Sequence, residues 1–518
     1  MDTDRGSDTT WTLELPDEAA TGRLARLVAD FVGAEDLVTL GGDLGAGKTT
    51  FARALVRQMV GDPDLDVPSP TFTLMQVYDG PRFPIVHADL YRVVRASELA
   101  ELGWDEAAEG ALVLVEWAER AGPALSPDRL DITFALDATR GDQFRRATLT
   151  GRGAFGPRLV LAMASDKLLR AAGWGDAERR FMQGDASTRA YERILRDDGT
   201  SAVLMISPPR PDGPPVRFGK PYSALAHLAE DIRPFLALAE GLRVQGFSAP
   251  AIYASDVPAG LALIEDFGSL PVVAPDEAGL LAPIPERYAE AAAVLAALHG
   301  RDLPDSLPVG NGETHTIPAY DLDALGIEAD LLVDWYAPHV LRTNIASGAK
   351  ATFGNLWRDA LAEVTEGPRT WALRDYHSPN LIWLPDREGI QRVGLLDFQD
   401  CVLGHPAYDL VSLLQDARVT VPDDLELKLL SSYAKLRRQH DPAFDMAAFA
   451  RAYALLGAQR ATKILGIFAR LDKRDRKPHY LAHLPRVRHA LVKSLAHPAL
   501  AELKAWYESN LPRLFDDA

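Results

Sequence analysis

The segment Gly42–Thr49 reads GDLGAGKT and matches the pattern G-x-x-x-x-G-K-[ST]. It directly follows the apolar stretch Leu37–Leu40 and precedes Thr50–Val60, whose apolar residues recur with helical spacing. In such a loop the glycines let backbone N–H groups converge on phosphate oxygens, and the following helix contributes the positive end of its dipole. The sequence therefore predicts a strand, a phosphate-binding loop and a helix in succession, as in an α/β P-loop domain.

Within this loop we expect Lys48 to contact the outer phosphates of a nucleotide and the Thr49 hydroxyl to ligate Mg²⁺. A second apolar strand, Ala111–Val115, ends in Glu116. P-loop ATPases place a second metal contact or a water-orienting group at such a strand end, although an ordinary exposed glutamate would fit the spacing as well. The candidate nucleotide-binding residues here are Gly42, Gly45, Gly47, Lys48, Thr49 and Thr50, with Glu116 as a metal-binding and catalytic candidate.

Two polar segments lie between these strands. Ser69–Leu74 is rich in hydroxyl side chains, and His87 and Asp89 flank a single alanine. They could sense the nucleotide, or they could form a turn and an ion pair between His87 and Asp89 at a strand end. The spacing alone leaves both interpretations open.

A second phosphate-handling pattern lies far downstream. Asp375 is followed five residues later by Asn380, and the stretch Val393–Leu396 ends in Asp397. Two antiparallel strands joined by a turn would bring the three side chains to one end. Kinases use such a set as a carboxylate that deprotonates the acceptor hydroxyl and two oxygen ligands for Mg²⁺. The alternative is a pair of unrelated polar turns flanking a hairpin.

Two neighbours of Asp375 are further candidates. Arg374 stands where kinases place a histidine or arginine before the catalytic aspartate. His377 could reach a substrate, or it could be a loop histidine with its hydrogen bonds satisfied. We expect Asp409 to hold the catalytic loop, and we assign no chemistry to 330–370 and 446–518, which read as helical core.

The region before this pattern resembles the small lobe of a kinase. Gly184–Arg189 lies between an expected helix, 165–173, and expected strands at 191–195 and 201–206. Its candidate phosphate-binding residues are Gly184, Ser187 and Arg189. The strand 201–206 lacks the lysine that most kinases carry there, and Arg189, Arg193 and Lys220 are the possible replacements. The stretch Leu261–Gly268 reads as the hinge between the lobes.

A chain of 518 residues is too long for one hydrophobic core. Because one active site rarely needs both phosphate-binding systems, we interpret the chain as two fused enzymes. We place an α/β P-loop domain at 1–158 and an α+β, two-lobed, kinase-like domain at 164–518, with a small lobe of about 164–268 and a large lobe of about 269–518. The glycine-rich stretch Gly151–Pro157 is a plausible boundary.

Charge and composition bear on partners and compartment. The net charge of −18 argues against binding of nucleic acid by the chain alone. No apolar run approaches the ~20 residues that span a bilayer, and the polar N-terminus is unlike a signal peptide. The single cysteine, Cys401, excludes an intrachain disulfide framework and fits a reducing compartment. We therefore expect a cytoplasmic location.

The first set of motifs closely resembles the TsaE family, small bacterial ATPases of the tRNA threonylcarbamoyladenosine pathway. The matching segments are Gly42–Thr49, Ser69–Thr73, His87–Arg92, Glu98-Leu99 and Glu116-Trp117. The resemblance implies that Lys48 and Thr49 serve the ATP phosphates and Mg²⁺, and that Glu116 serves the metal or water. Asp89 and Trp117 match functional positions whose role it does not specify. It also implies TsaB and TsaD, the threonylcarbamoyl-transferase subunits, as partners that bring the tRNA.

The second set resembles the aminoglycoside phosphotransferase superfamily, and within it the amino-sugar kinases of the AmgK type. The matching segments are Gly184–Ser187, Leu204-Met205 with Pro208-Pro209, Asp375–Leu381, Leu396–Asp400, Gly404–Leu413 and Asp416–Arg418. This resemblance implies phosphorylation of N-acetylmuramate and N-acetylglucosamine by ATP at the anomeric hydroxyl, in cell-wall recycling.

We therefore expect a bifunctional enzyme that uses ATP and Mg²⁺ at two sites. Two alternatives remain open at this stage. The second domain could phosphorylate a different small molecule, such as an aminoglycoside or a small alcohol. One half could instead be a non-catalytic nucleotide-binding module that regulates the other.

Overall fold

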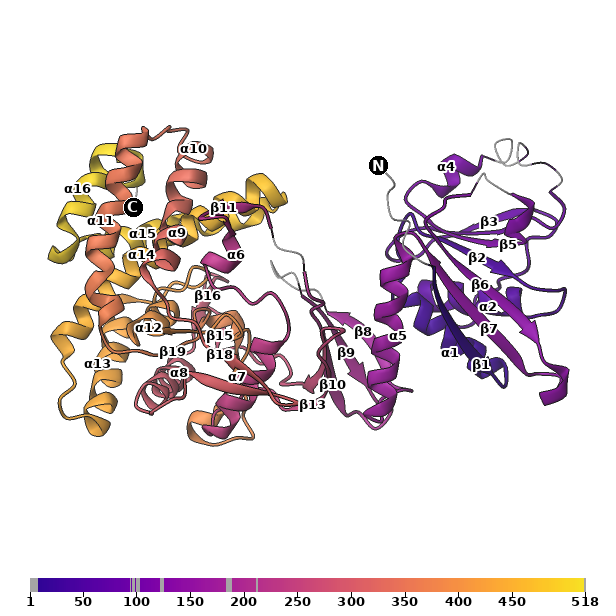
Figure 1. Cartoon of the computed structure of the whole chain (residues 1–518), viewed down its shortest axis with the longest axis horizontal. Coiled ribbons are helices and arrows are strands. Elements are labelled where there is room, and N and C mark those ends of the chain that lie inside the picture. Colours follow the sequence, from indigo (N-terminus) through magenta and orange to yellow (C-terminus); the bar gives the residue numbers. More distant parts are fainter. Residues whose placement is uncertain are drawn as a thin grey trace. The chain divides into compact units, whose positions relative to one another are not determined.

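The computed structural model describes residues 8–516 except 94, 96–97, 99–102, 122–124, 183–188 and 211–212. The chain forms two compact units (Figure 1). The first comprises Met1–Asp185 with Tyr191–Thr200, and the second comprises Ala186–Ala190 with Ser201–Ala518.

The first unit is built on a sheet with the strand order β1-β7-β6-β2-β5-β4-β3. The neighbours β4, β5, β2 and β6 are parallel, and antiparallel strands complete both edges. The elements are β1 (Thr9–Leu15), α1 (Glu18–Ala29), β2 (Leu37–Gly41), α2 (Lys48–Val60), β3 (Met75–Tyr78), β4 (Ile85–Asp89), α4 (Trp104–Ala108), β5 (Leu112–Glu116), β6 (Arg129–Leu136), β7 (Arg145–Arg152) and α5 (Phe155–Ala171). The predicted α/β P-loop architecture is confirmed.

Both faces of this sheet are covered by hydrophobic cores. Successive residues on a strand point to opposite faces, so each central strand contributes to both cores. Leu112 and Leu114 pack into one core, which also contains residues of α1, α2 and α5. Val113 and Val115 pack into a second core, with Trp104 of α4 against it. For this reason the central strands β2 and β5 are largely apolar.

The helix expected at 165–173 begins ten residues earlier, at Phe155, and packs against β1 and β7. After it, β8 (Glu178–Met182) pairs antiparallel with β9 (Ala190–Leu195), and the register runs from Glu178–Leu195 to Met182–Tyr191. The Arg179 side chain donates to Glu192 at 2.7 Å and lies 3.4 Å from the carboxylate of Asp30, the residue that follows α1. This hairpin therefore makes an ionic contact with the C-terminal end of α1.

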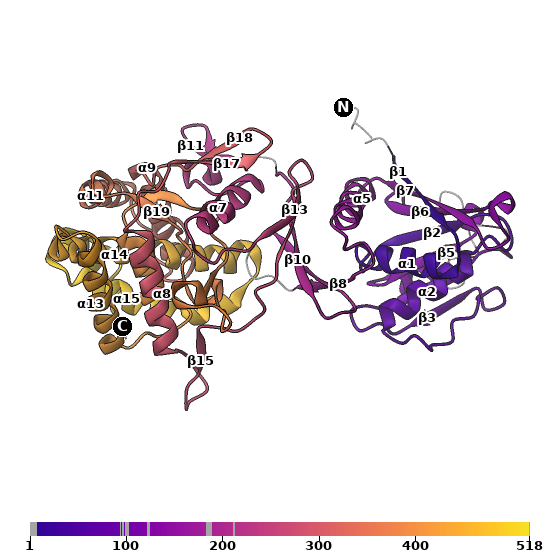
Figure 2. The same cartoon turned by 90° about the horizontal axis from the view of Figure 1, so that it is seen from below.

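The second unit begins with the antiparallel strands β10 (Ser201–Ile206), β14 (Leu261–Glu265) and β13 (Ile252–Asp256), and the rest is mostly helical (Figure 2). Its two-stranded sheets are β11 (Pro215–Arg217) with β12 (Lys220–Pro221), β15 (Val273–Pro275) with β16 (Leu281–Pro283), β17 (Ser306–Gly310) with β18 (Glu313–Thr316), β19 (Thr370–Ala372) with β22 (Val402–Gly404), and β20 (Leu381–Trp383) with β21 (Val393–Leu395). The predicted α+β, kinase-like class is confirmed.

The helices of the second unit pack largely around α14, which is buried through most of its middle. A helix buried on nearly all sides usually carries apolar residues all round, so polar residues inside it need partners. The helices are α6 (Tyr222–Leu225), α7 (Arg233–Val244), α8 (Pro285–Leu298), α9 (Leu322–Leu331), α10 (Ala337–His339), α11 (Ser347–Glu366), α12 (Ala407–Leu414), α13 (Asp423–His440), α14 (Met446–Asp475), α15 (Leu484–Leu495) and α16 (Ala501–Asn510).

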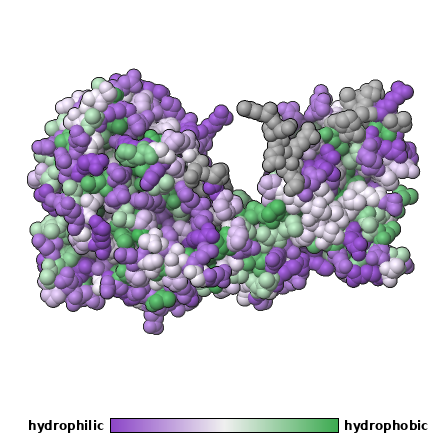
Figure 3. Space-filling view, viewed as in Figure 1, coloured by the Kyte–Doolittle hydropathy of each residue, from purple (hydrophilic) through white to green (hydrophobic). Residues whose placement is uncertain are grey.

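None of the helices in the described ranges has both the length and the apolar character needed to cross a membrane. On the face shown in Figure 3, hydrophobic residues are interspersed among hydrophilic ones.

His405, in the turn between β22 and α12, gives a pH-dependent prediction for stability. Its Nδ1 accepts a hydrogen bond from the Ala407 N–H at 3.1 Å, and burial lowers the pKa of the imidazole to about 4. In the unfolded chain a histidine titrates at a pKa of about 6.5. Between these two pKa values the unfolded state binds a proton that the folded state rejects, so stability is lost as the pH falls.

We expect His405→Asn to remove this pH dependence of the stability, because asparagine does not titrate. Its amide oxygen can still accept the hydrogen bond from the Ala407 N–H. From about pH 7.5 to about pH 5, the free energy of unfolding of the wild type should fall about 2 kcal/mol more than that of the variant. Urea unfolding at the two pH values measures the difference. Equal pH dependence in both proteins would show that His405 does not stay neutral in the folded state.

Candidate active sites

The P-loop connects β2 to α2, and its first glycine is required by geometry. Gly42 has φ +124°, and a Cβ on it would lie 2.2 Å from the carbonyl oxygen of Phe134. Gly45 and Gly47 also have positive φ, but a Cβ on Gly45 would meet no atom within 4 Å. Thr50 is half-buried in the first turn of α2. The loop can therefore approach β6 only because residue 42 has no side chain.

Gly42→Ala should consequently be more damaging than Gly45→Ala, although both positions have left-handed backbones. We expect the first variant to lose at least about 2 kcal/mol of stability in the first unit, because a buried main-chain atom must move. It should also lose nucleotide binding. Thermal unfolding with and without ATP, compared between the two variants, measures both effects. Indistinguishable melting curves would contradict the tight contact with Phe134.

The lysine of the loop is held close to the main chain. The Nζ atom of Lys48 donates to the carbonyl oxygens of Gly42 at 2.7 Å and Asp43 at 3.0 Å. The same atom lies 4.0 Å from the ring centre of Trp117. Trp117 follows β5 with φ 60°, and its ring contacts that of Tyr91. The structure thus places Trp117 beside the lysine of the P-loop.

Glu116 lies at the centre of this site. The Thr49 hydroxyl donates to its two carboxylate oxygens at 2.9 and 3.0 Å, and the Nε2 atom of His87 lies 3.0 Å from one of them. Glu116 is only 2% exposed, so the interpretation as an ordinary exposed strand-end glutamate is wrong. Asp89 does not pair with His87. It accepts hydrogen bonds from the hydroxyls of Ser69 and Thr71 and from the Tyr91 N–H.

The donor set at this loop fits a nucleotide-bound Mg²⁺. Thr49 and Glu116 supply two oxygen donors, and Lys48 supplies a cation for phosphates. Mg²⁺ in nucleotide sites usually keeps several waters and binds one or two protein ligands together with phosphate oxygens. In the described part of the chain, no cluster of three or more His, Cys, Asp or Glu could hold a metal by itself.

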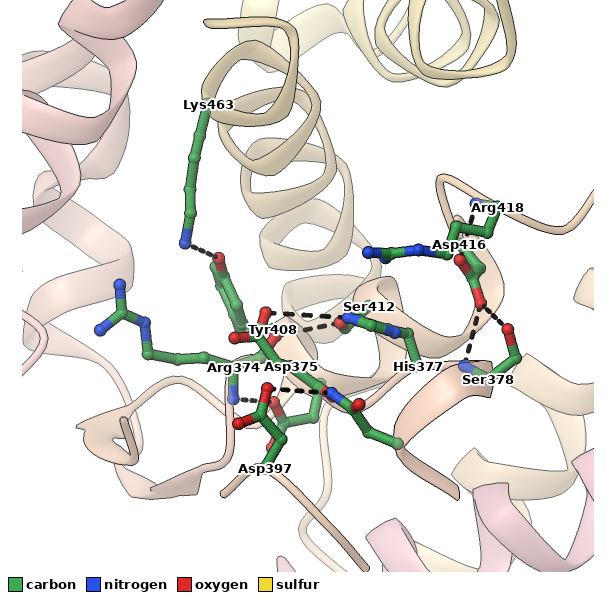
Figure 4. A network of polar contacts seen from close by, with 12 residues as sticks. Arg374, Asp375, His377, Ser378, Asp397, Tyr408, Ser412, Asp416, Arg418 and Lys463 are labelled. Carbon is green, nitrogen blue, oxygen red and sulfur yellow. Dashed lines mark hydrogen bonds and ion pairs between the residues drawn. The ribbon is translucent and has the colours of Figure 1, made fainter. Parts of the chain in front are cut away.

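In the second unit, residues of α12 hold the loop that carries Asp375; Figure 4 shows Tyr408 and Ser412 of this helix beside Arg374 and Asp375. The carboxylate of Asp409 accepts the N–H groups of Leu373 at 2.7 Å and Arg374 at 2.9 Å, and the Ser412 hydroxyl donates to the Arg374 carbonyl at 3.0 Å. Burial raises the pKa of Asp409 to about 7, although these two backbone hydrogen bonds favour its charged form. The predicted loop-holding role of Asp409 is confirmed.

Asp375, Asn380 and Asp397 lie together, as expected. The hairpin of β20 and β21 pairs Leu381 with Leu395, so residues 380 and 397 emerge from the same end. The Nδ2 group of Asn380 donates to the Asp375 carbonyl at 3.0 Å and lies 3.4 Å from an Asp397 carboxylate oxygen. Its amide oxygen is therefore the atom that could ligate a metal. The alternative of two unrelated turns is wrong.

The two carboxylates differ in electrostatics. Desolvation and the negative charge of Asp375 raise the pKa of Asp397 to about 6, against the opposing effect of Arg189. For Asp375, desolvation also favours a higher pKa, but the positive charges around it outweigh this and the pKa is lowered. The Asp375 side chain is 38% exposed. It is thus an ionised and accessible carboxylate, as a general base requires.

Among the three cations considered as replacements for the small-lobe lysine, Arg189 contacts Asp397, a candidate metal ligand. Its guanidinium lies 3.1 Å from an oxygen of Asp397 and 3.9 Å from one of Asp400. Lys220 is exposed on β12, and Arg193 lies on β9 in the first unit. The remaining candidates of this loop, Gly184 and Ser187, lie outside the described residues.

His377 lies beside the catalytic base, with Nε2 3.9 Å from a carboxylate oxygen of Asp375. Burial lowers the pKa of His377 to about 4, so the ring is neutral near pH 7. Its Nδ1 is buried and has no hydrogen-bond partner among the described residues, so the ring is not a fully satisfied loop histidine. The next residue, Ser378, donates through its hydroxyl and N–H to Asp416.

Polar residues that the sequence did not identify surround Arg374. Its guanidinium is buried and donates to Glu328 of α9, which is itself 0% exposed. The Nζ atom of Lys463 lies 2.9 Å from Glu328 and 3.2 Å from the Tyr408 hydroxyl. Lys463 belongs to the segment 446–518, which the sequence analysis interprets as helical core without chemistry. A polar run inside an otherwise apolar helix, here Gln459, Arg460, Thr462 and Lys463, was the available signal.

These two constellations define the class of protein. A P-loop with its lysine, hydroxyl and buried acid is the arrangement typical of an ATPase site, and in the second unit Asp375, Asn380 and Asp397 are grouped as the base and the metal-binding pair are in kinase-like phosphotransferases. The protein is therefore an enzyme that combines P-loop and kinase-like phosphate chemistry.

Comparison with known proteins agrees with this division. Residues 15–146 match the family of the threonylcarbamoyl adenosine biosynthesis protein TsaE, and residues 178–448 match the phosphotransferase enzyme family. The chain belongs to both families, one in each part, which confirms the predicted fusion.

Three relatives document the match. An N-acetylmuramate/N-acetylglucosamine kinase of Caulobacter vibrioides is 42% identical over 359 residues, covering 67% of this chain and 96% of that protein. The kinase of the same name from Pseudomonas aeruginosa is 32% identical, covering 65% and 90%. A tRNA threonylcarbamoyladenosine biosynthesis protein TsaE of Rickettsia felis is 42% identical over 124 residues, covering 24% and 72%.

Proposed function

We propose that the second unit transfers the γ-phosphoryl group of ATP to the anomeric hydroxyl of N-acetylmuramate and N-acetylglucosamine. The observation that carries this proposal is the grouping of Asp375, Asn380 and Asp397 at one end of a hairpin, in a chain whose kinase relatives are named for these two sugars.

In this proposal the three side chains have separate roles. Asp375 accepts the proton of the sugar hydroxyl as that oxygen attacks phosphorus. Asn380 and Asp397 would hold Mg²⁺, which neutralises charge on the ATP phosphates when it is bound. Arg189, 3.1 Å from Asp397, supplies a cation for the phosphates in the absence of a lysine on β10. The anomeric hydroxyl is more acidic than the other sugar hydroxyls, so a carboxylate base suffices.

Phosphorus NMR of the product is the test. The full chain, Mg-ATP and either sugar should yield an acid-labile phosphate whose signal couples to the proton on C1. A 6-phosphate would show that the phosphorylated position is wrong, while the kinase chemistry would stand. Phosphorylation of an aminoglycoside or a small alcohol, with no reaction of either sugar, would favour the other substrate classes.

We further propose that the first unit hydrolyses ATP as the TsaE component of tRNA threonylcarbamoyladenosine synthesis, with TsaB- and TsaD-type subunits as partners. Lys48 would contact the nucleotide phosphates, and Thr49 with Glu116 would hold Mg²⁺ or orient water. The net charge of −18 supports contact with tRNA through those partners only.

A reconstitution tests this second activity. The full chain should replace a TsaE protein in modification of tRNA by purified TsaB- and TsaD-type subunits, and nucleotide analysis of the tRNA reads the result. No replacement, despite ATP binding at the P-loop, would favour a regulatory nucleotide-binding module. Both reactions consume ATP and the chain has one cysteine, so we place the protein in the cytoplasm.

A further inference from the structure

Arg460 is a buried arginine without a partner. It lies in the middle of α14 and is 5% exposed. Throughout the described part of the chain, no hydrogen bond or ion pair of its guanidinium is found. Burying an unpaired charge is costly, and buried arginines are normally paired. The guanidinium of Arg460 thus has hydrogen-bonding capacity that the described part of the chain does not use, and it is available to a partner outside the chain.

The neighbouring polar residues of the same helix show the contrast. Lys463 is paired with Glu328 and with the Tyr408 hydroxyl. Gln459 donates to the Leu325 carbonyl at 3.0 Å and to Glu328 at 3.2 Å. These side chains are used within the protein, whereas Arg460 is not. On this helix, Gln459 and Lys463 thus belong to a structural network, whereas Arg460 is a candidate for binding a ligand.

Arg460 lies on the side of α14 that serves the catalytic loop. The helix packs against α12, whose residues Asp409 and Ser412 hold that loop. Arg460 acts electrostatically on the loop: desolvation raises the pKa of Asp375, but the interactions with His377, Lys463 and Arg460 lower it. Arg460 also lowers the pKa of Asp409, against the larger effect of burial. The guanidinium charge is thus felt at the catalytic base, although it forms no ion pair with it.

The guanidinium is also accessible. The polar atoms that are sealed from solvent and unpartnered in the described ranges include none of its nitrogens. Since those nitrogens have no partner, each of them must open onto accessible space. Water, or a group that displaces it, can therefore reach these nitrogens.

We propose that Arg460 binds the carboxylate of an anionic acceptor sugar and thereby favours N-acetylmuramate over N-acetylglucosamine. This inference rests on the proposed sugar kinase activity. The two sugars differ by the lactyl ether, which carries the carboxylate, and a guanidinium matches a carboxylate with two parallel hydrogen bonds. The neutral sugar would leave Arg460 unpaired, so the charge discriminates between the substrates.

The test uses the full chain and three acceptors: N-acetylmuramate, its methyl ester and N-acetylglucosamine. In the wild type, kcat/KM for N-acetylmuramate should exceed that for the neutral ester about tenfold or more, the usual effect of a charged hydrogen bond. Arg460→Gln should lower kcat/KM for N-acetylmuramate by a similar factor and change the values for the two neutral acceptors less than about threefold. Arg460→Lys should give an intermediate loss.

Arg451→Gln is the matched control, because Arg451 lies exposed on the same helix and pairs with Glu363. It should leave all three values unchanged. Equal losses for all three acceptors in Arg460→Gln would show a structural role and overturn the proposal. A wild type that phosphorylates N-acetylglucosamine but does not prefer the acid over its ester would overturn it without needing any variant. A wild type that phosphorylates none of the three would instead refute the sugar kinase function, and this inference with it.

Discussion

Asp375→Asn should lower kcat for sugar phosphorylation by about two orders of magnitude or more and leave ATP binding in place. The asparagine keeps the shape of the side chain, but it cannot accept the proton of the attacking hydroxyl. The structure supports this role because the surrounding positive charges lower the pKa of Asp375, so the carboxylate is ionised at neutral pH. Release of ADP, measured in a coupled assay, gives kcat, and calorimetric titration with ATP gives the binding.

Asp386→Asn is a suitable control, since Asp386 is an exposed residue in the turn after β20. It should behave as the wild type. If Asp375→Asn kept more than about a tenth of the wild-type kcat, general-base catalysis by Asp375 would be excluded as the main contribution.

Lys48→Ala should abolish ATP turnover by the first unit and leave sugar phosphorylation nearly intact. The ammonium group is the cation of the P-loop, and its loss removes charge stabilisation usually worth several kcal/mol. The neutral alanine also releases the carbonyl oxygens of Gly42 and Asp43, to which Lys48 now donates. ATP hydrolysis in the presence of TsaB- and TsaD-type subunits measures the first activity.

Sugar phosphorylation by the same preparation is the internal control for this variant, because Asp375, Asn380 and Asp397 belong to the second unit. Asp375→Asn should show the reverse pattern. An equal loss of both activities in Lys48→Ala would falsify the view that the two sites work independently.

Local patterns predicted much of this protein. The strand expected at 201–206 is β10 with the same bounds, and the P-loop lies between its predicted strand and helix. These features depend on residues that are close in sequence. The early start of α5 was missed because the glycines and the proline of Gly151–Pro157 indicated a loop, whereas Phe155 already packs into the core of the first unit.

Partners across the sheet were harder to predict. His87 was weighed as a partner of Asp89, two residues away, yet it contacts Glu116. The reason is that β4 and β5 are parallel neighbours, which no local pattern reveals. Arg460 was missed for a related reason: α14 follows the catalytic motif at a long sequence distance, and its polar residues form no recognisable motif. Long-range packing, rather than local propensity, decides such contacts.

The hairpin of β8 and β9 has a consequence for dissecting this protein. The phosphotransferase match begins at residue 178, but Glu178–Met182 and Tyr191–Leu195 belong to the first compact unit, where Arg179 contacts Asp30. A fragment that starts at residue 178 would take Arg179 away from this carboxylate, and a fragment that ends after β9 would deprive the kinase of strands within its matched region. Single substitutions in the intact chain therefore separate the two activities more cleanly than proteolysis or truncation.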